Sequence, residues 1–300
     1  MERIKNFEQM VEHLSRMERK RCVAVVCPND DSTQQALKAA IDKDLLTAWI
    51  VGATDAAKRL FAPYGDKVKA IDAADADDAA RKGVELVREG KADVLVKGLL
   101  NTDNLLHAVL NKEGGLLPKG AVLTHMACAE LPAEGRMLLF SDAAVIPCPN
   151  DIQREKQLEY AVKMANRLGI DRPKVALVNC SEKVSEKFFP HTLHYREMAE
   201  KARRGDYGNV TVDGPLDLKT SLNAEALHKK GIESPVGGQA DVLIFPGIQS
   251  ANVFYKAMTF LVGAKTAGVL CGTTAPVVLP SRGDNTTAKF LSLAMACMME

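Results

Sequence analysis

Short apolar runs alternate with longer amphipathic stretches along the whole chain. The runs are rich in β-branched residues and continuously apolar, as expected of strands that are buried on both faces of a sheet. They predict strands over 22–27, 47–52, 93–98, 121–126, 136–140, 174–179, 241–246 and 267–271. The stretches 31–46, 75–90 and 151–169 have the apolar spacing of helices. This alternation predicts parallel β–α–β units and an α/β fold.

Polar residues stand at the start of several predicted helices, where a side chain can accept a hydrogen bond from a free backbone N–H. A helix is expected after the strand 93–98, another over 252–263, and a last one over 285–299. The expected caps are Asp31 or Ser32, Thr102 or Asp103, Ser250, and one of Asn285, Thr286 and Thr287.

Two stretches with paired prolines, 141–151 and 273–284, are the points where the chain is expected to pass between domains. A length of 300 residues favours two domains over one. We therefore predict a discontinuous first domain over 1–140 plus 281–300, and a second domain over 141–280. The second stretch would then lie beside an inter-domain cleft, a favoured place for a ligand.

The bulk composition excludes several classes of protein. The chain is 47% hydrophobic and 26% charged, and its 39 basic and 38 acidic residues give no basic surface for nucleic acid. No apolar run reaches the roughly 20 residues of a membrane helix, and residues 1–21 are too charged for a secretory leader. Most of the seven cysteines lie in apolar runs and none forms a C-x-x-C pair. We expect a cytoplasmic protein with buried, reduced thiols, no metal site, and no nucleic-acid or membrane partner.

The most polar corner of the C-terminal region is the sequence LPSRGDNTTAKF, residues 279–290. A glycine before a helix start, with a serine and an arginine beside it, is typical of an anion site, because free N–H groups and the helix dipole favour negative charge. The integrin-binding interpretation of RGD is set aside, since three residues match by chance and a cytoplasmic chain would not meet the receptor. A phosphate site and a plain polar loop stay open. The candidate residues are Ser281, Arg282, Gly283, Asp284 and Asn285.

Further polar residues follow three of the predicted strands. Ligands of open α/β sheets bind beyond the carboxyl ends of the strands, so these residues are candidates for a ligand site. Each also has a structural alternative: a surface lysine, a structural histidine, or a turn that needs its residues for geometry alone. The candidates are Lys97, Gly98, Thr102, His125, Gln249 and Asn252.

Taken in order, VDGPLDLKTSL, SPVGGQADVLIFPGIQSANVFYK and VVLPSRGDNTTAKF resemble the phosphate acetyltransferase and phosphate butyryltransferase family. The resemblance extends back to ADVLVKG and FSDAAVIPCPN, and KGLLNTDNLLHAVL is more similar to the butyryltransferase branch. It implies two α/β/α domains with a cleft, and direct, reversible transfer of a short acyl group from acyl-CoA to inorganic phosphate. It also implies a homodimer, with coenzyme A thioester as a substrate and no permanently bound cofactor.

The resemblance assigns roles to particular residues. Ser281 and Arg282 match the family's serine–arginine pair, which is associated with coenzyme A binding and catalysis. The acetyltransferase branch has an aspartate a few residues further on, near Ala288 here, and Asp284 is the candidate to replace it. That branch also has an arginine in the helix matched by 102–110, where this chain has His107 and no arginine. Lys97 or His107 is the expected substitute in phosphate binding, and Asp284 or His125 is a candidate base for the thiol.

Two alternatives to a butyryltransferase remain. One is an acetyl-specific enzyme, and the other is a non-catalytic protein that binds acyl-CoA or phosphate on the same scaffold. A decarboxylating dehydrogenase of related architecture is a more distant rival, since it needs a metal held by grouped aspartates and the chain has no D-x-x-x-D helix.

Overall fold

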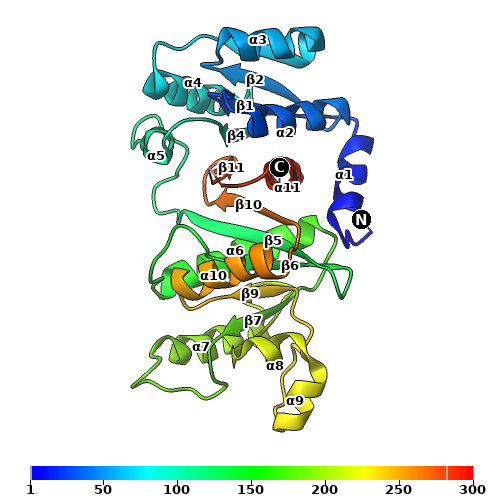
Figure 1. Cartoon of the computed structure of the whole chain (residues 1–300). Helices are drawn as coiled ribbons and strands as arrows, with labels where there is room; N and C mark the ends of the chain where they lie inside the picture. Colours follow the sequence, from blue (N-terminus) through cyan, green and yellow to red (C-terminus); the bar gives the residue numbers. More distant parts are fainter. Residues whose placement is uncertain (1, 282, 300) are drawn as a thin grey trace. The chain divides into compact units, whose positions relative to one another are not determined.

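The computed structural model describes residues 2–281 and 283–299. They form a mixed α/β fold with mostly parallel strand pairing, which confirms the predicted fold class (Figure 1). The helices are α1 (Phe7–Arg16), α2 (Asp31–Asp42), α3 (Asp55–Phe61), α4 (Ala76–Arg88), α5 (Thr102–Val109), α6 (Asp151–Arg167), α7 (His191–Arg204), α8 (Leu218–Leu222), α9 (Ala224–Lys230), α10 (Ile248–Lys256) and α11 (Thr286–Met299), with a 3₁₀ helix over Ala62–Lys67 and a π-helix over Ala257–Leu261. The strands are β1 (Arg21–Val26), β2 (Leu46–Val51), β3 (Val68–Ile71), β4 (Val94–Lys97), β5 (Thr124–Leu131), β6 (Arg136–Ser141), β7 (Lys174–Val178), β8 (Thr211–Leu216), β9 (Val242–Ile244), β10 (Thr266–Cys271) and β11 (Val277–Val278).

The described residues pack into two compact units. Unit 1 contains residues 2–6 and 124–264, and unit 2 contains residues 7–123 and 265–299. These units are defined by packing alone, so the domain boundaries expected from the sequence, 1–140 plus 281–300 and 141–280, stay a prediction.

Unit 2 is built on strands in the order β3-β2-β1-β4-β11-β10. All neighbours in this order are parallel except β10 and β11. Right-handed crossovers from β1 to β2 and from β3 to β4 run in opposite directions, so α2 and α4 cover opposite faces of the sheet (Figure 1). The connections diverge between β1 and β4, and this switch point is where an open α/β sheet offers a crevice for a ligand.

Unit 1 is built on strands in the order β5-β6-β9-β7-β8. The parallel strands are β6, β9, β7 and β8, and β5 runs antiparallel to β6 with Met126 opposite Ser141. In its core, Phe254 of α10 packs edge-on against Phe140 of β6, with ring centroids 5.1 Å apart. This contact fixes α10 on the sheet, and with it the side chains at the start of that helix.

The structure corrects one predicted strand and one prediction about thiols. Only residues 124–126 of the strand expected over 121–126 belong to a strand, β5 at Thr124–Leu131, so His125 lies near the beginning of a strand and not at its end. Cys27 and Cys271 are buried as expected, but Cys180 lies just beyond β7 and is exposed, as is Cys148. Cys180 lies two residues beyond the last residue of β7, where the apolar run no longer guarantees burial.

Three of the four predicted helix caps are wrong. Asp30, one residue before the predicted pair, caps α2 by accepting a bond from the N–H of Thr33. Helix α5 begins after Asn101, whose side chain makes no capping bond, and α10 begins after Gly247, earlier than predicted, so the hydroxyl of Ser250 donates to the carbonyl of Gly247 at 2.9 Å. The fourth is confirmed, because Oδ1 of Asn285 accepts from the N–H of Ala288 at 2.8 Å.

Candidate active site

Three loops of unit 2 leave neighbouring strands at the same edge of the sheet. Val26 of β1 lies opposite Lys97 of β4, and Val96 of β4 lies opposite Val278 of β11. The loops that begin at Cys27, Gly98 and Leu279 therefore emerge side by side at the switch point. Sequence reasoning placed Lys97, Gly98 and the corner 281–285 at strand ends, and the register brings their strands together.

Gly98 is required by the close approach of two of these loops. A Cβ at this position would lie 2.3 Å from the carbonyl oxygen of Cys27, a distance that no larger residue tolerates. The backbone N–H of Gly98 donates to the carbonyl of Val26 at 2.8 Å, and that of Leu99 donates to Cys27 at 2.7 Å. The β1 and β4 loops are thus joined by backbone bonds, which fixes the position of Lys97 at the carboxyl end of β4.

Lys97 is a buried cation, with an exposed fraction of 4%. Its ammonium lies 3.3 Å from the carbonyl oxygen of Gly98. Thr102 is the first residue of α5 and is exposed, and His107 is exposed on the same helix. A buried lysine at the carboxyl end of a strand is well suited to an anionic ligand, because its charge is screened little by solvent.

The corner before α11 is a compact, hydrogen-bonded turn. Oδ2 of Asp284 accepts from the N–H of Ser281 at 2.8 Å, and the N–H of Asp284 donates to the carbonyl of Ser281 at 3.1 Å. The hydroxyl oxygen of Ser281 accepts from the N–H of Gly283 at 3.3 Å, which leaves the hydroxyl hydrogen available to donate. Asn285 then caps α11. Arg282 lies outside the described residues.

An ion pair between the buried Lys289 and the half-buried Asp30 holds α11 to the start of α2. The ammonium of Lys289 donates to Oδ2 of Asp30 at 2.7 Å and to the hydroxyl of Thr33 at 2.9 Å. Burial raises the pKa of Asp30, but hydrogen bonds from Lys289, Ser32 and Thr33 outweigh it and lower the pKa to about 2. The N-termini of α2 and α11 are therefore fixed relative to one another within unit 2, and they follow the loops that leave β1 and β11.

In unit 1, His125 lies at the edge of the sheet where the parallel strands end, although it stands at the beginning of its own strand. Because β5 is antiparallel, its first residues lie beside the carboxyl end of β6, where Met126 pairs with Ser141. The ring of His125 is half-buried and contacts the ring of Tyr255 edge-on, with centroids 6.5 Å apart. His125 therefore lies at the predicted edge of the sheet, but at the beginning of a strand and not at the end of one.

Asp142 organises the turn that follows β6. Its carboxylate accepts bonds from the backbone N–H groups of Ala144, Val145 and Ile146, at 2.8, 2.9 and 3.1 Å, and from the hydroxyl of Thr124 at 2.8 Å. The amide of Asn252 on α10 donates to the carbonyl of Ala143 in this turn at 2.9 Å. Asn252 is thus tied to the turn, while Gln249, one turn earlier on α10, is exposed.

Comparison with known proteins identifies the family of the chain. The family described as "Phosphate acetyl/butaryl transferase" matches residues 53–297, which is most of the chain. The chain belongs to this phosphate acyltransferase family.

Similar members include a phosphate butyryltransferase of Clostridium acetobutylicum, which is 36% identical over 99% of this chain and 98% of its own length. A phosphate acetyltransferase of Thermotoga maritima is 34% identical over 92% of this chain and 94% of its own length. Among solved structures, a branched-chain phosphotransacylase of Enterococcus faecalis V583 superposes with a TM-score of 0.81, at 31% identity over 93% of this chain and 98% of that one.

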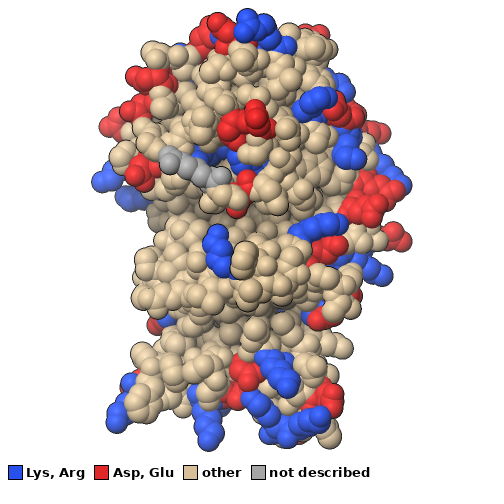
Figure 2. All heavy atoms as spheres, viewed as in Figure 1, with Lys and Arg blue, Asp and Glu red and all other residues tan. Residues whose placement is uncertain are grey.

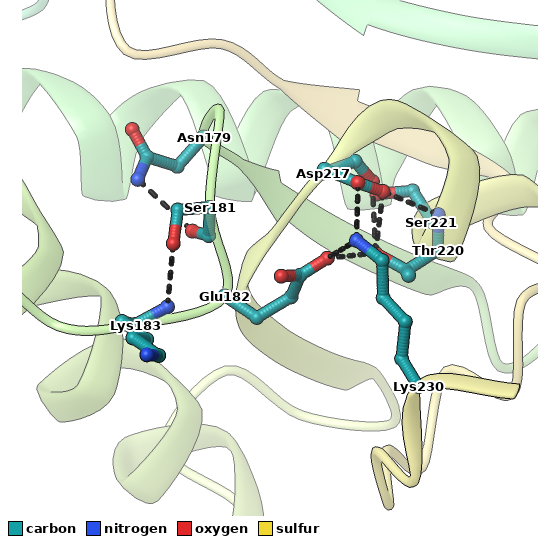
Figure 3. Close-up of polar contacts among 8 residues, drawn as sticks. All are labelled: Asn179, Ser181, Glu182, Lys183, Asp217, Thr220, Ser221 and Lys230. Carbon is teal, nitrogen blue, oxygen red and sulfur yellow. Dashed lines mark hydrogen bonds and ion pairs between the residues drawn. The ribbon is translucent and has the colours of Figure 1, made fainter. Parts of the chain in front are cut away.

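One of the motifs that carry the family resemblance forms a polar cluster at the carboxyl ends of β7 and β8 (Figure 3). Asp217 caps α8 through the N–H of Thr220 at 2.6 Å, and the ammonium of Lys230 contacts both Asp217 and Glu182 at 2.7 Å. Burial raises the pKa of Asp217, but hydrogen bonds from Lys230 and Thr220 lower it to about 2. The cluster gives the DLKTS part of the motif a local structural role, because its hydrogen bonds and ion pairs hold the segment after β8 in place.

The charged surface of this family member is mixed in sign. Figure 2 shows acidic and basic side chains interspersed on the face in view.

Within residues 2–281 and 283–299, no helix is both long and apolar enough to cross a membrane.

Sequence reasoning missed three polar residues that organise the candidate site, namely Asp30, Asp142 and Lys289. Each follows or faces a strand end, and Asp142 and Lys289 stand within or beside the motifs that carry the resemblance. The available signal was position, since Asp142 comes directly after β6 and Asp30 lies in the loop after β1, four residues beyond Val26. Lys289 had no such signal, because its partner is 259 residues away in the chain.

Proposed function

We propose that this chain catalyses the reversible transfer of a short-chain acyl group, preferably butyryl, from acyl-CoA to inorganic phosphate, giving acyl phosphate and coenzyme A. The observation that carries the proposal is 36% identity to a phosphate butyryltransferase over 299 residues, nearly the full length of both chains. The geometry of unit 2 supports it, because a helix N-terminus, a turn rich in N–H groups and a buried lysine adjoin one sheet edge.

The reaction needs no covalent nucleophile on the protein. A phosphate oxygen attacks the thioester carbonyl carbon, the carbon–sulfur bond breaks, and the coenzyme A thiolate leaves. In the reverse direction the thiolate attacks the acyl phosphate and inorganic phosphate leaves. The contribution of the protein is to hold two anionic substrates in line and to stabilise the oxyanion of the tetrahedral intermediate.

Particular residues are suited to these tasks. The hydroxyl of Ser281 has a hydrogen to donate to the oxyanion, since its oxygen already accepts from Gly283. Lys97 and the N-terminal end of α11 offer positive charge to phosphate. The family resemblance associates Arg282 with coenzyme A binding and catalysis, and its guanidinium is suited to balance the charge of phosphate. His125 is the candidate to exchange a proton with the thiol.

The experiment is an assay of free thiol release with the purified chain, phosphate and a panel of acyl-CoA substrates from C2 to C6, including isobutyryl-CoA. We expect phosphate-dependent release with the highest kcat/KM for butyryl-CoA. A maximum at acetyl-CoA would favour the second candidate, a phosphate acetyltransferase, which the 34% identity to the Thermotoga maritima enzyme supports. No phosphate-dependent release with any member of the panel would leave the binding protein as the better interpretation.

Two variants test the proposed roles. Ser281→Ala should lower kcat about a hundredfold, as expected when one oxyanion donor is lost, while Thr287→Ala, a matched change on the exposed side of α11, should not. Arg282→Ala should abolish phosphate-dependent turnover and leave the circular dichroism spectrum unchanged. Near-normal turnover of Arg282→Ala would contradict the assignment of the corner as the reacting site. The homodimer, the cytoplasmic location and the lack of a permanently bound cofactor stay predictions.

A further inference from the structure

A pocket of 370 Å³ lies within unit 1, at the edge of the sheet opposite to His125 and Asn252. Lys174 begins β7, Arg136 begins β6, and Asp241 directly precedes β9, and all three line the pocket. The six residues of β6 alone separate the two edges by roughly 17 Å, at about 3.3 Å per residue. The pocket is therefore distinct from every unit 1 residue assigned to the proposed reaction.

The lining of the pocket has more positive than negative charge. Its charged side chains, all in the described part of the chain, are Arg3, Glu134, Arg136, Arg172, Lys174 and Asp241. Asp241 is paired with Arg3 at 2.6 Å, and Glu134 is paired with Arg136 at 2.6 Å. Both carboxylates are thus neutralised by their own arginines.

The two remaining cations have no carboxylate partner within the described residues. The ammonium of Lys174 donates to the neutral side-chain oxygen of Gln239 at 2.9 Å. Arg172 is exposed, and its guanidinium makes no hydrogen bond or ion pair with any residue that the structure describes. A concave surface with a formal surplus of two positive charges concentrates anions from solution.

The walls of the pocket are fixed by backbone contacts. Gly238 has a φ of +66°, and a Cβ there would lie 2.4 Å from the backbone nitrogen of Ala224. The N–H of Ile4 donates to the carbonyl of Leu168 at 2.9 Å, which holds Arg3 at the rim. The guanidinium of Arg136 donates to the carbonyl of Ala240 at 2.8 Å. The cavity and its paired charges are therefore formed before any ligand arrives.

We propose that this pocket binds a small organic phosphate, with the phosphate group on Arg172 and Lys174. A phosphomonoester carries about −1.5 to −2 charges at neutral pH, which matches the surplus of two. The guanidinium of Arg172 offers a bidentate fork to two phosphate oxygens, and Lys174 offers a compact point charge. The volume exceeds the needs of inorganic phosphate alone and falls in the range of about 300 to 1,000 Å³ that is usual for small-molecule pockets. The site adds a ligand to the protein and does not depend on the proposed function.

The test is isothermal titration calorimetry of the full chain at low salt without acyl-CoA. The probes are glycerol 3-phosphate, ribose 5-phosphate and adenosine monophosphate, with citrate as a polycarboxylate comparison. We expect saturable binding of at least one phosphomonoester. In the variant Arg172→Gln/Lys174→Gln its affinity should fall by about tenfold to a hundredfold, the usual loss when hydrogen bonds to charged groups are removed.

Two controls make the result specific. Arg196→Gln/Lys163→Gln removes two exposed cations of the same unit, on α7 and α6, which form no ion pair with any described residue, and should bind the probe as the unmodified chain does. Arg282→Gln should also retain binding in this pocket. Arg172 is exposed and has no ion pair among the described residues, and Lys174 loses only an exposed bond to the neutral side chain of Gln239. The double variant should therefore unfold at nearly the same urea concentration as the unmodified chain.

Several outcomes would overturn the proposal. They are the absence of binding by every phosphomonoester, equal affinity in the Arg172→Gln/Lys174→Gln variant, and loss of binding in Arg282→Gln alone. Binding of citrate through Arg172 and Lys174, without binding of any phosphomonoester, would overturn the ligand class. Absence of thiol release in the acyl-CoA assay would not affect this test, because the two proposals use different residues and different measurements.

Discussion

Replacement of Lys289 by methionine should weaken the packing of α11 against α2. Methionine keeps the apolar stem of the side chain and removes the ammonium that binds Asp30 at 2.7 Å and Thr33 at 2.9 Å. The Lys289 side chain is 9% exposed and that of Asp30 is 22% exposed, so this pair is far less solvated than a typical surface ion pair. The change leaves a half-buried carboxylate without its cation.

The size of the effect follows from two arguments. Removal of one partner of a fully buried pair costs about 3 to 5 kcal/mol, and less here, since Asp30 keeps its bonds from Ser32 and Thr33. The pKa of Asp30 is lowered from 3.8 to about 2. At about 1.4 kcal/mol per pKa unit this corresponds to an upper bound of about 2.5 kcal/mol, since several hydrogen bonds share it. After allowance for solvent screening of the exposed part, we expect Lys289→Met to lower the free energy of unfolding by about 2 kcal/mol.

The assay is urea unfolding followed by the fluorescence of Trp49, the only tryptophan in the chain. Trp49 lies in β2, so its signal reports on unit 2. The carboxyl group of Asp30 has a lower pKa in the folded than in the unfolded chain. Its stabilising effect is therefore complete above the unfolded value of 3.8 and is lost as the pH falls towards 2. The difference between the unmodified chain and Lys289→Met should accordingly shrink between pH 5 and pH 3.

Lys38→Met is the matched control, because Lys38 pairs with Asp42 at 2.7 Å on the exposed side of α2, the same helix that Asp30 caps. That pair is solvated, so no measurable change is expected. The reasoning is refuted if Lys289→Met and Lys38→Met unfold at the same urea concentration, or if the effect of Lys289→Met persists unchanged at pH 3.

Three further substitutions test the local arguments. Gly98→Ala should cost about 1 to 3 kcal/mol by Trp49 fluorescence, since its Cβ would meet the Cys27 carbonyl oxygen at 2.3 Å; an unchanged midpoint would contradict the close approach. Asp142→Ala should cost about 3 kcal/mol or more by circular dichroism in urea, because it leaves three backbone N–H groups and one hydroxyl without their acceptor; Asp142→Asn should recover part of the loss. Asn285→Ala should cost about 1 kcal/mol through loss of the α11 cap, and Asn285→Asp should cost less; equal losses would argue against capping.

The buried strands could be predicted from sequence because burial on both faces leaves a continuous apolar run. β1 and β4 lie in the interior of the sheet of unit 2, and both were predicted to within one residue at each end. β3 was missed, since it is an edge strand with exposed Lys69 and Ala70, and its sequence VKAI is too mixed to stand out. β11 has two residues and β8 contains a glycine and a proline, so neither has the pattern of a strand.

The sequence predicts residues of the candidate site only where they stand at the end of an apolar run. Lys97 and the corner after β11 were found because each follows an apolar run, and the parallel register places those runs next to each other. For His125, the same rule gave the right edge for the wrong reason, since an antiparallel strand begins where its parallel neighbours end. The pair of Asp30 and Lys289 was out of reach, because no local pattern reports a contact between residues so distant in the chain.

Asp284 raises the question of why the proposed anion site would contain a carboxylate. The structure answers with geometry: one oxygen of Asp284 accepts the N–H of Ser281, and the backbone N–H of Asp284 returns a bond to the Ser281 carbonyl. The negative charge is therefore engaged in closing the turn that presents Ser281.

We propose that Asp284 positions the serine and does not act as the base. An asparagine at this position would keep the oxygen that accepts the N–H, so Asp284→Asn should retain most of kcat and leave the pH profile of the reaction unchanged, whereas loss of the base would remove one limb of that profile. In this proposal, the polar groups of Asp284 and Asn285 form the turn and the helix cap. The hydroxyl hydrogen of Ser281 is then the one that can donate to the substrate.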